Sequence, residues 1–561
     1  MAGVRHDQGL RSKWARGQGG TGLSQHRSDL VGQEFSVTLV EGPRDGGGAG
    51  MGLVRHNALR TNIATGEWVQ PLTRDFATSR VGPYGPLPMS PIDYLLLSAI
   101  LLIAGASLLA PEHGRRVLRP ATLITAVLAV AQFAMEGFYW QLLPGYLLIL
   151  VAGALATRRS HPVSVGWRRR LSQAGIVALM AAAAVPWMML LPVPRLPPPA
   201  GPYAVGSQTY RWIDPARAEE ATADSTDRRN AIDQAWYPAA AGGTGRTIYI
   251  DGLGRLPARV SLLPRFLFRH FDRIDTHAAP QAPLAESRPW PVVLFLPGYG
   301  APRAAYSGLV ADLASRGYVV LAIDHPYEGA VTELADGRIA TTVEHLLPGE
   351  RNRIPFMQRR LAVRIGDVRF VLDQLARQGV LEPPLAGRLD LDHVAIAGHS
   401  FGGAAAALAM DGDDRLKAAA NIDGTLYGSL SSRTGARPFL LVESDHDVTR
   451  HSQWYEDGNR AFFARFGGGW RYELKHANHY SFTDVFLFFA PPGRLAVEQV
   501  MGGGRGPVKT QRATTDLLAA FLQGPLTGKP GRIETVVARY RDIVGGVYTS
   551  SSLSDRLDPR E

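Results

Sequence analysis

Apolar and polar positions divide the chain into regions with different patterns. Residues 1–88 show neither a helical nor a strand period, and they are rich in Gly, Arg, Ser and Gln. This composition predicts a disordered tail. Met89 stands directly before the first long apolar stretch, which suggests that translation begins there and that residues 1–88 are not made. Detection of Met1 at the N-terminus of the natively expressed protein would contradict that hypothesis.

Residues 89–193 contain four long apolar stretches, each about the length that crosses a hydrocarbon core. They cover residues 94–110, 121–135, 138–156 and 176–193. We therefore expect four transmembrane helices. The connections after the first and third stretches are rich in arginine, whereas the connection between the second and third has only Glu136; the arginines are Arg115, Arg116, Arg119, Arg158, Arg159, Arg168, Arg169 and Arg170. The positive-inside rule places these two connections in the cytoplasm, so whatever follows the fourth stretch is extracytoplasmic.

A Pro-rich segment at 194–202 is typical of a stiff, extended linker. Residues 203–525 then alternate between apolar strand-like runs and longer helical patterns. The runs lie at 247–250, 291–296, 318–323, 393–397, 418–422, 438–442 and 471–474, and the helical patterns at 303–315, 357–378 and 514–522. Apolar strands separated by helices predict an α/β fold with a mostly parallel sheet covered on both faces. Residues 526–561 are predicted to be a C-terminal extension, with a tail after about residue 542.

The segment around Ser400 carries the clearest chemical signal. Residues 398–402 read G-H-S-F-G, after a strand-like run and before small residues that suit a helix. Strand, sharp turn and helix form the context in which G-x-S-x-G is a nucleophile elbow. Such an elbow belongs to the α/β-hydrolase fold. Its oxyanion hole uses the backbone N–H of the residue after the serine, here Phe401.

A serine nucleophile needs a histidine base and a carboxylate that orients it, in the chain order Ser, acid, His. The histidines after Ser400 are His446, His451, His476 and His479. His479 follows the last predicted strand, and we favour it over His476, which still belongs to that strand. The sequence pattern alone does not decide which carboxylate is the acid of the triad. Asp423 ends the strand after the elbow, and Asp445 or Asp447 ends the next strand, the commoner place in the fold.

Three segments resemble the platelet-activating factor acetylhydrolase family of serine-dependent α/β-hydrolases: residues 300–330, the GHSFGGAAA stretch and the NIDGTLYG stretch. The resemblance covers roughly residues 203–522. It implies that Asp423 is the acid, that His479 is the base in an H-x-x-F-x-D context, and that Tyr299 supplies the second oxyanion amide. Asp447 is kept as the reserve acid. The four apolar stretches are outside the family pattern, and Pro297 stands where the family tends to have histidine.

Charge and cysteine content limit the remaining functions. The formal net charge is +10, but residues 201–561 carry 41 Lys and Arg against 40 Asp and Glu. The basic excess lies in the first 200 residues, so we expect no nucleic-acid partner. The chain has no cysteine, which excludes disulfides and thiolate catalysis. Since no His or Asp set has metal-ligand spacing and no loop has phosphate-binding form, no cofactor or metal is expected.

These observations predict a multi-pass membrane protein with an extracytoplasmic carboxylic ester hydrolase domain. The resemblance implies short acyl chains on phospholipid-like substrates of the 1-alkyl-2-acetylglycerophosphocholine esterase type. Residues 328–355 are long, polar and rich in glycine, and they are expected to form a lid. Two alternatives stay open: an esterase of polyester or cutin type, and a non-catalytic binding module with the same fold. The oligomeric state is left open too.

Overall fold

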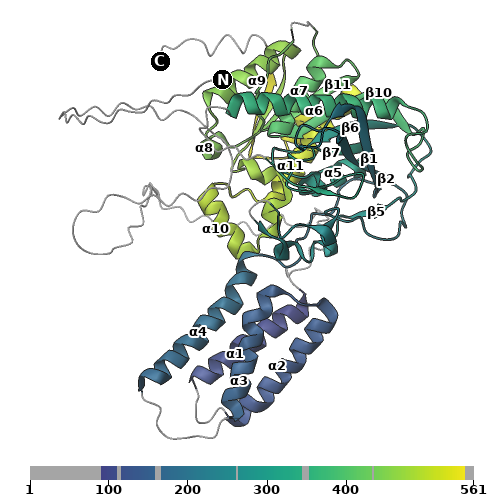
Figure 1. Ribbon diagram of the computed structural model, residues 1–561. Helices are drawn as coiled ribbons and strands as arrows, with labels where there is room; N and C mark the ends of the chain where they lie inside the picture. Colours follow the sequence, from purple (N-terminus) through teal and green to yellow (C-terminus); the bar gives the residue numbers. More distant parts are fainter. Residues whose placement is uncertain are drawn as a thin grey trace, which may run out of the picture.

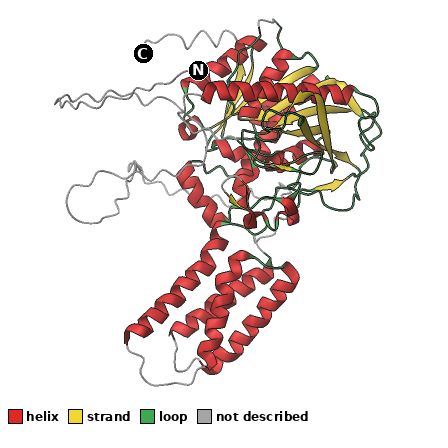
Figure 2. Ribbon diagram, in the orientation of Figure 1, coloured by secondary structure: helices red, strands yellow, loops and turns green. Residues whose placement is uncertain are grey.

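A computed structural model describes residues 90–109, 115–157, 166–260, 263–343, 353–431 and 435–549. The predicted tail at 1–88, Arg158 and Arg159, and residues 344–352 of the expected lid are outside these ranges. Figure 1 shows a bundle of helices beside a larger α/β domain, and Figure 2 shows that the strands are confined to the larger domain.

The four predicted apolar stretches form helices that pack side by side in a bundle (Figure 1). They are α1 (Pro91–Leu109), α2 (Arg115–Glu136), α3 (Leu143–Thr157) and α4 (Gly166–Met189). Leu96, Ile100 and Leu148 are among the side chains that fill the bundle interior. Many outward side chains are large and apolar, for example Leu102 at 73% and Val130 at 69% exposure.

The four stretches do form helices, but the expectation of four membrane spans is not supported. Among the described helices, one segment, Leu118–Glu136, is long and apolar enough to cross a membrane, judged by length and composition alone. The first and third helices contain shorter apolar segments, Pro91–Ala106 and Trp140–Ala154. The predicted stretch at 138–156 is interrupted because its first residues form a loop and the short 3-10 helix η1 (Trp140–Leu142) before α3 begins.

The larger domain is built on a sheet of ten strands in the order β14-β13-β12-β11-β10-β6-β7-β2-β1-β5. The six central strands β7, β6, β10, β11, β12 and β13 run parallel to one another, whereas β2 and β14 flank them antiparallel. The bounds of the ten strands are β1 (Ala204–Ala218), β2 (Arg228–Ala239), β5 (Ala278–Pro280), β6 (Trp290–Leu296), β7 (Val319–Asp324), β10 (Leu389–His399), β11 (Leu416–Ile422), β12 (Phe439–Ser444), β13 (Gly469–Leu474) and β14 (Ile543–Tyr548). The predicted mostly parallel sheet is therefore present.

Helices cover both faces of the sheet, so each face has its own apolar core. One core contains Leu361 of α6, Ala405 of α7 and Phe462 of α9, and the other contains Leu309 of α5 and Leu517 of α11. The helices of the domain are α5 (Ser307–Ser315), α6 (Arg353–Ala376), α7 (Phe401–Gly412), α8 (His446–Thr449), α9 (Gln453–Phe466), α10 (Pro491–Met501), α11 (Pro507–Thr527) and α12 (Ile533–Val537). The predicted helices at 303–315 and 357–378 correspond to η5 (Arg303–Tyr306) with α5, and to α6.

Two sequence-based expectations about the domain are wrong, and one pair of strands was not predicted. The run at 247–250 is not a strand, whereas residues 204–239 form the long antiparallel pair β1 and β2. That pair was missed because β2 buries polar residues such as Arg229, Asp233 and Gln234, which interrupt the apolar pattern. Residues after 542 are not all tail, because β14 pairs antiparallel with β13 and forms one edge of the sheet. The strand was not predicted because Gly545 and Gly546, which have low strand propensity, interrupt its apolar pattern.

The Pro-rich segment 194–202 lies against the domain. Ala200 N donates to Asp312 Oδ1 at 2.6 Å, and Gly201 packs so closely that a Cβ there would meet Ser315 O at 2.1 Å. The bundle also contacts the domain directly, through His270 Nε2 and Phe138 O at 2.7 Å and through the perpendicular rings of Trp140 and Phe266. The bundle and the hydrolase-like domain are thus joined by packing as well as by the chain.

Candidate active site

Ser400 lies in the sharp turn between β10 and α7. Its backbone has φ 55 and ψ −125, a region that non-glycine residues rarely occupy. Ser400 N donates to Ile422 O at 2.7 Å, which ties the turn to the end of β11. A strained turn at the carboxyl edge of a parallel sheet is the geometry of a nucleophile elbow. The sequence prediction for this segment is confirmed in its backbone form.

The two glycines of the motif are required by close backbone approaches. A Cβ at Gly402 would lie 2.1 Å from Leu296 O, and a Cβ at Gly398 would lie 2.3 Å from Gly402 O. Both distances are shorter than real Cβ contacts allow. Any side chain at these positions would push α7 away from the end of β6 or open the turn around Ser400.

Asp423 and His479 meet beside this turn, which is the pairing that the family resemblance implies. His479 Nδ1 and Asp423 Oδ2 are 2.7 Å apart, and both side chains are buried. Burial raises the pKa of Asp423, but the charges and hydrogen bonds of His451 and His479 outweigh burial and hold that pKa well below its usual range. The ionised carboxylate accepts, so the Nδ1 of His479 carries the hydrogen and its Nε2 has a free lone pair.

The hydroxyl of Ser400 makes no hydrogen bond to His479 within the described part of the chain. The two residues are nevertheless close in the fold, because His399, the neighbour of Ser400, bonds through Nε2 to His479 O at 3.0 Å. Hydrogen bonds between nucleophile and base are often loose in proteins without substrate and tighten in the complex.

Among the competing candidates for acid and base, Asp447 and His476 lie on the surface, whereas Asp445 is buried and bonded to Lys475 and to the backbone N–H of His476. Asp447 has a side chain that is 89% exposed, and it pairs with Lys475 at 3.2 Å. Asp445 also pairs with Lys475, at 2.8 Å. The side chain of His476 is 71% exposed. The geometry therefore favours the acid that the family resemblance implies over the one at the commoner position.

Two backbone N–H groups border the nucleophile. Phe401 is the first residue of α7, where N–H groups have no partner within the helix. Tyr299 follows Gly298, and a Cβ on Gly298 would lie 3.4 Å from the Cβ of Ser400. The predicted oxyanion donors thus belong to the two segments on either side of Ser400.

Arg364 was not identified from the sequence, yet it contacts both of these segments. From α6, its Nη1 donates to Pro297 O at 2.5 Å and its Nη2 to Gly298 O at 3.3 Å. Its guanidinium lies 4.6 Å from the centre of the Phe401 ring. The carbonyl of Gly298 and the N–H of Tyr299 share one planar peptide unit and point in opposite directions. By holding the carbonyl, Arg364 directs the N–H away from itself.

Replacing Arg364 by lysine is expected to lower kcat for a short-chain ester by about 10- to 100-fold, because a lysine cannot hold two carbonyls in a fixed fork. KM should change little. The measurement is steady-state kinetics on full-length protein, with the melting temperature recorded because Arg364 also pairs with buried Glu328.

The matched control for this variant is Arg359→Lys, the same change at an exposed position on α6. It should behave as wild type. An Arg364→Lys protein with normal stability and unchanged kcat would contradict the role given to the guanidinium.

A chain of hydrogen bonds links the loop of Gly298 to His479. Gly298 N donates to Tyr306 Oη at 2.9 Å, and that hydroxyl is 2.8 Å from His399 Nδ1. The other nitrogen of His399 reaches His479 O. Burial holds the pKa of His399 well below its usual range, so its ring is neutral. A neutral ring accepts at Nδ1 and donates at Nε2, which makes every donor in this chain meet an acceptor.

His451 is a second residue that sequence reasoning missed. Its Nε2 lies 2.8 Å from Asp423 Oδ1, so the acid contacts two imidazoles. His451 lies in the short loop between α8 and α9, where no sequence pattern relates it to Asp423.

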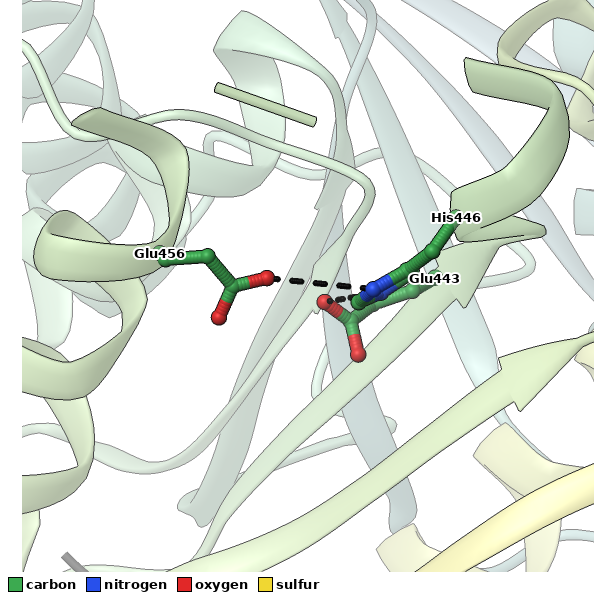
Figure 3. A group of neighbouring side chains, drawn as sticks. All are labelled: Glu443, His446 and Glu456. Carbon is green, nitrogen blue, oxygen red and sulfur yellow. Dashed lines mark ion pairs between the residues drawn. The ribbon is translucent and has the colours of Figure 1, made fainter. Parts of the chain in front are cut away.

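A group of titratable side chains lies behind His451. Figure 3 shows Glu443, His446 and Glu456, whose ligand-type atoms lie within 4.8 Å of one another. Both carboxylates are already paired with Arg471, at 2.6 Å for Glu443 and 2.8 Å for Glu456. Because the guanidinium already binds oxygens of both carboxylates, this group does not have the free donors of a metal site.

Aromatic rings continue from the oxyanion segments to a surface pocket of about 520 Å³. The ring of Phe401 lies 6.0 Å from that of Tyr299 and 5.8 Å from that of Tyr427, which in turn lies 6.0 Å from Trp454. Trp454 Nε1 donates to Leu426 O at 2.7 Å, which fixes the indole. The pocket is lined by Gln358, Leu426, Tyr427, Gly428, Trp454, Asp457, Gly458 and Ala461.

Comparisons with known proteins agree with this geometry. Residues 193–362 match the family described as platelet-activating factor acetylhydrolase, isoform II, and residues 293–549 match the alpha/beta hydrolase family. The solved structure of a ferulic acid esterase from Streptomyces cinnamoneus superposes with a TM-score of 0.53 and 26% identity, over 63% of this chain and 99% of that one. These matches show that the larger domain has the α/β-hydrolase fold.

Two curated relatives carry related names. A probable 1-alkyl-2-acetylglycerophosphocholine esterase of Arthroderma benhamiae is 33% identical over 155 residues, which are 27% of this chain and 36% of that protein. The platelet-activating factor acetylhydrolase of Canis lupus familiaris is 26% identical over 315 residues, 51% of this chain and 66% of that protein. The chain thus spans less than two thirds of these relatives' lengths. The predicted resemblance to the platelet-activating factor acetylhydrolase family is confirmed, and the matched proteins named here are esterases or acetylhydrolases.

Proposed function

We propose that the protein is a membrane-anchored serine hydrolase that cleaves carboxylic esters through an acyl-serine intermediate. One observation carries the proposal: a serine in a strained strand-to-helix turn lies beside a buried, hydrogen-bonded Asp423–His479 pair. This combination supports a catalytic site better than a non-catalytic binding module, since a binding module has no use for a strained serine next to an oriented base.

The proposed reaction has two halves. Ser400 Oγ attacks the ester carbonyl while His479 Nε2 takes its proton, and the N–H groups of Tyr299 and Phe401 bind the oxyanion. His479 then gives the proton to the departing alcohol. In the second half, water attacks the acyl-serine, with the same base and the same oxyanion donors. Asp423 holds the imidazole ring and stabilises its positive charge in both halves. None of these steps calls for a cofactor.

The proposed substrates are esters with short acyl chains on a phospholipid-like alcohol. The names of the two relatives support this choice, since both describe enzymes of acetylated lipids. The proposed location supports it too, because a site close to a bilayer meets lipid esters at high local concentration.

The bundle is proposed to anchor the protein in a membrane as a multi-pass segment, with the hydrolase domain on the extracytoplasmic side. Its support is physical: the outward faces of the helices expose large apolar side chains, which water disfavours and a bilayer accepts. The exposed side chains include Leu95, Leu102, Leu123, Ile124, Val127, Val130, Phe133, Leu147 and Leu150. Protease accessibility of the hydrolase domain in intact cells tests the sidedness.

Hydrolysis of p-nitrophenyl esters from acetyl to palmitoyl by the full-length protein tests the activity. We expect turnover of the short esters and labelling of Ser400 by a fluorophosphonate probe. If no ester is cleaved and the probe does not label Ser400, the non-catalytic alternative is correct.

A second candidate substrate class is an ester with a large or aromatic acyl group, as in polyester- or cutin-like esterases. The row of rings from Tyr299 to Trp454 and the pocket beside it favour this class, because flat apolar groups stack on such surfaces. The relative from Streptomyces cinnamoneus is itself named a ferulic acid esterase. Esterases of this second class are expected to carry their acid one strand later than Asp423, where Asp447 stands in this chain. The side chain of Asp447 is 89% exposed, so its position gives no support to this class.

Replacing Trp454 by alanine separates the two classes. If an aromatic acyl group occupies the pocket, kcat/KM for methyl ferulate should fall about tenfold, because one stacking partner is lost. Hydrolysis of p-nitrophenyl acetate should stay unchanged, since an acetyl group does not reach the indole. Ile213→Ala, an exposed apolar position on β1 near the other edge of the sheet, is the control. Equal effects on both esters would contradict the pocket assignment.

A further inference from the structure

The buried carboxylate of Asp423 accepts four hydrogen bonds, two on each oxygen. Oδ2 accepts from His479 Nδ1 at 2.7 Å and from Ser444 Oγ at 2.8 Å. Oδ1 accepts from His451 Nε2 at 2.8 Å and from Ser444 N at 2.9 Å. The two imidazoles therefore bind different oxygens of one carboxylate, and they do not compete for the same atom.

The two imidazoles differ in what their second nitrogen meets. His451 is enclosed: its ring stacks on Tyr455 at 3.9 Å, the ring of His446 stands perpendicular to it at 4.8 Å, and its side chain is 5% exposed. Its Nδ1 is buried and has no hydrogen-bond partner among the described residues. The ring of His479, in contrast, lies 4.5 Å from that of His399, next to Ser400. Only His479 is placed to exchange a proton with the nucleophile.

An enclosed imidazole with an unpaired nitrogen is costly. A buried polar atom without a partner destabilises a fold, because it has lost its hydrogen bonds to water and gained none in return. An apolar ring at this position would keep the stack on Tyr455 and avoid that cost. What an apolar ring could not do is donate a hydrogen bond to Asp423 Oδ1.

We propose that His451 is a positioning residue of the triad, which holds Asp423 by one oxygen so that the other stays directed at His479. The proposal rests on the serine-hydrolase function given above. With Oδ1 held by an imidazole N–H and by the backbone of Ser444, the carboxylate cannot rotate away when the imidazolium of His479 forms. His451 acts through Asp423 and does not touch the substrate.

The groups around His451 determine which property of the enzyme should change when the imidazole is replaced. Asp423 and Ser444 lie on one side, His446 and Tyr455 contact its ring, and Glu443 and Arg471 lie behind His446. Among these, only Asp423 connects His451 to the reacting atoms. When the N–H of His451 is removed, one fewer hydrogen bond offsets the negative charge of Asp423. The carboxylate then attracts protonated His479 more strongly.

The test compares His451→Phe with His451→Gln in the full-length protein. Phenylalanine keeps the stacking and removes the donor, whereas the glutamine amide can donate from near the position of Nε2. For His451→Phe we expect kcat to fall about 10- to 30-fold with KM within about twofold, as for a small misplacement of a catalytic group. The acid limb of its pH–rate profile should move toward higher pH. His451→Gln should recover most of the rate.

Rates are divided by the concentration of sites that a fluorophosphonate labels, so that partial unfolding does not count as lost catalysis. His476→Gln, at an exposed histidine nearby, is the control. Unchanged kcat and pH profile in His451→Phe, or a loss that glutamine does not recover, would overturn the positioning role. A loss of about 10³-fold or more in His451→Phe, with His479→Ala still active, would overturn it by making His451 the base. Absence of hydrolysis by the wild-type protein would instead remove the proposed function, and this inference with it.

Discussion

Replacing Ser400 by alanine is expected to lower kcat/KM for p-nitrophenyl acetate by at least about 10⁴-fold, the largest loss of any single change considered. The reason is that no other group can form the covalent intermediate, and water in its place is neither oriented by the elbow nor deprotonated at the right point. The stability of the protein should hardly change, because alanine fills the turn without a new contact. Steady-state kinetics with thermal unfolding measures both quantities.

The control for this variant is Ser225→Ala, a serine in an exposed turn between β1 and β2. Its activity should equal that of wild type. If Ser400→Ala retains more than about 1% of the wild-type rate, the hydrolysis does not pass through an acyl-enzyme at Ser400.

Replacing Asp423 by asparagine should lower kcat by about 10³- to 10⁴-fold, because the amide favours the wrong tautomer of His479 and cannot stabilise its charge. Some stability will also be lost, since the carboxylate accepts several buried hydrogen bonds. The pKa of Asp423 lies well below its usual value, so its interactions stabilise the fold above the unfolded-state pKa and are lost as the pH falls through the folded-state pKa. Kinetics at neutral pH therefore compares fully ionised wild type with the neutral variant.

The same change at Asp447 separates the two candidate acids. Asp447→Asn alters an exposed side chain that pairs with Lys475, and exposed pairs contribute little. Its activity should stay within about twofold of wild type. A larger loss at Asp447 than at Asp423 would contradict the geometry and assign the acid to the later strand.

Local patterns predicted the central part of the domain well. The apolar strands at 291–296 and 418–422 and the elbow between β10 and α7 all depend on short-range features: β-branched runs, glycines and a helix start. Each is dictated by residues that are adjacent in the sequence. The choice of Asp423 over Asp447 depended on the family resemblance, because both aspartates end a predicted strand.

Contacts between distant segments could not be predicted in this way. Arg364 reaches the carbonyl of Gly298 only after α6 packs over the sheet. An arginine is usually exposed, so nothing in the local sequence predicted that this one is buried. His451 meets Asp423 through the path of one loop, which no periodicity encodes. Two polar side chains of β2 are paired with other elements: Arg229 with Asp367 of α6 at 2.7 Å, and Gln234 with Ser207 Oγ of β1 at 2.9 Å. Their partners become visible only in the folded chain.

The edge strand β14 supports the part of the sheet from which the loop of His479 extends. It is hydrogen-bonded along the whole of β13, the strand that leads into the loop carrying His479. Proteolytic clipping after α11 would therefore strip one neighbour from that strand, although the cut lies far along the chain from Ser400. The clipped protein would keep its nucleophile and its elbow but would expose the backbone edge of β13, which can pair with another molecule. The short segment Ile543–Tyr548 thus protects the proposed base, His479, from the side of the sheet farthest from β1 and β2.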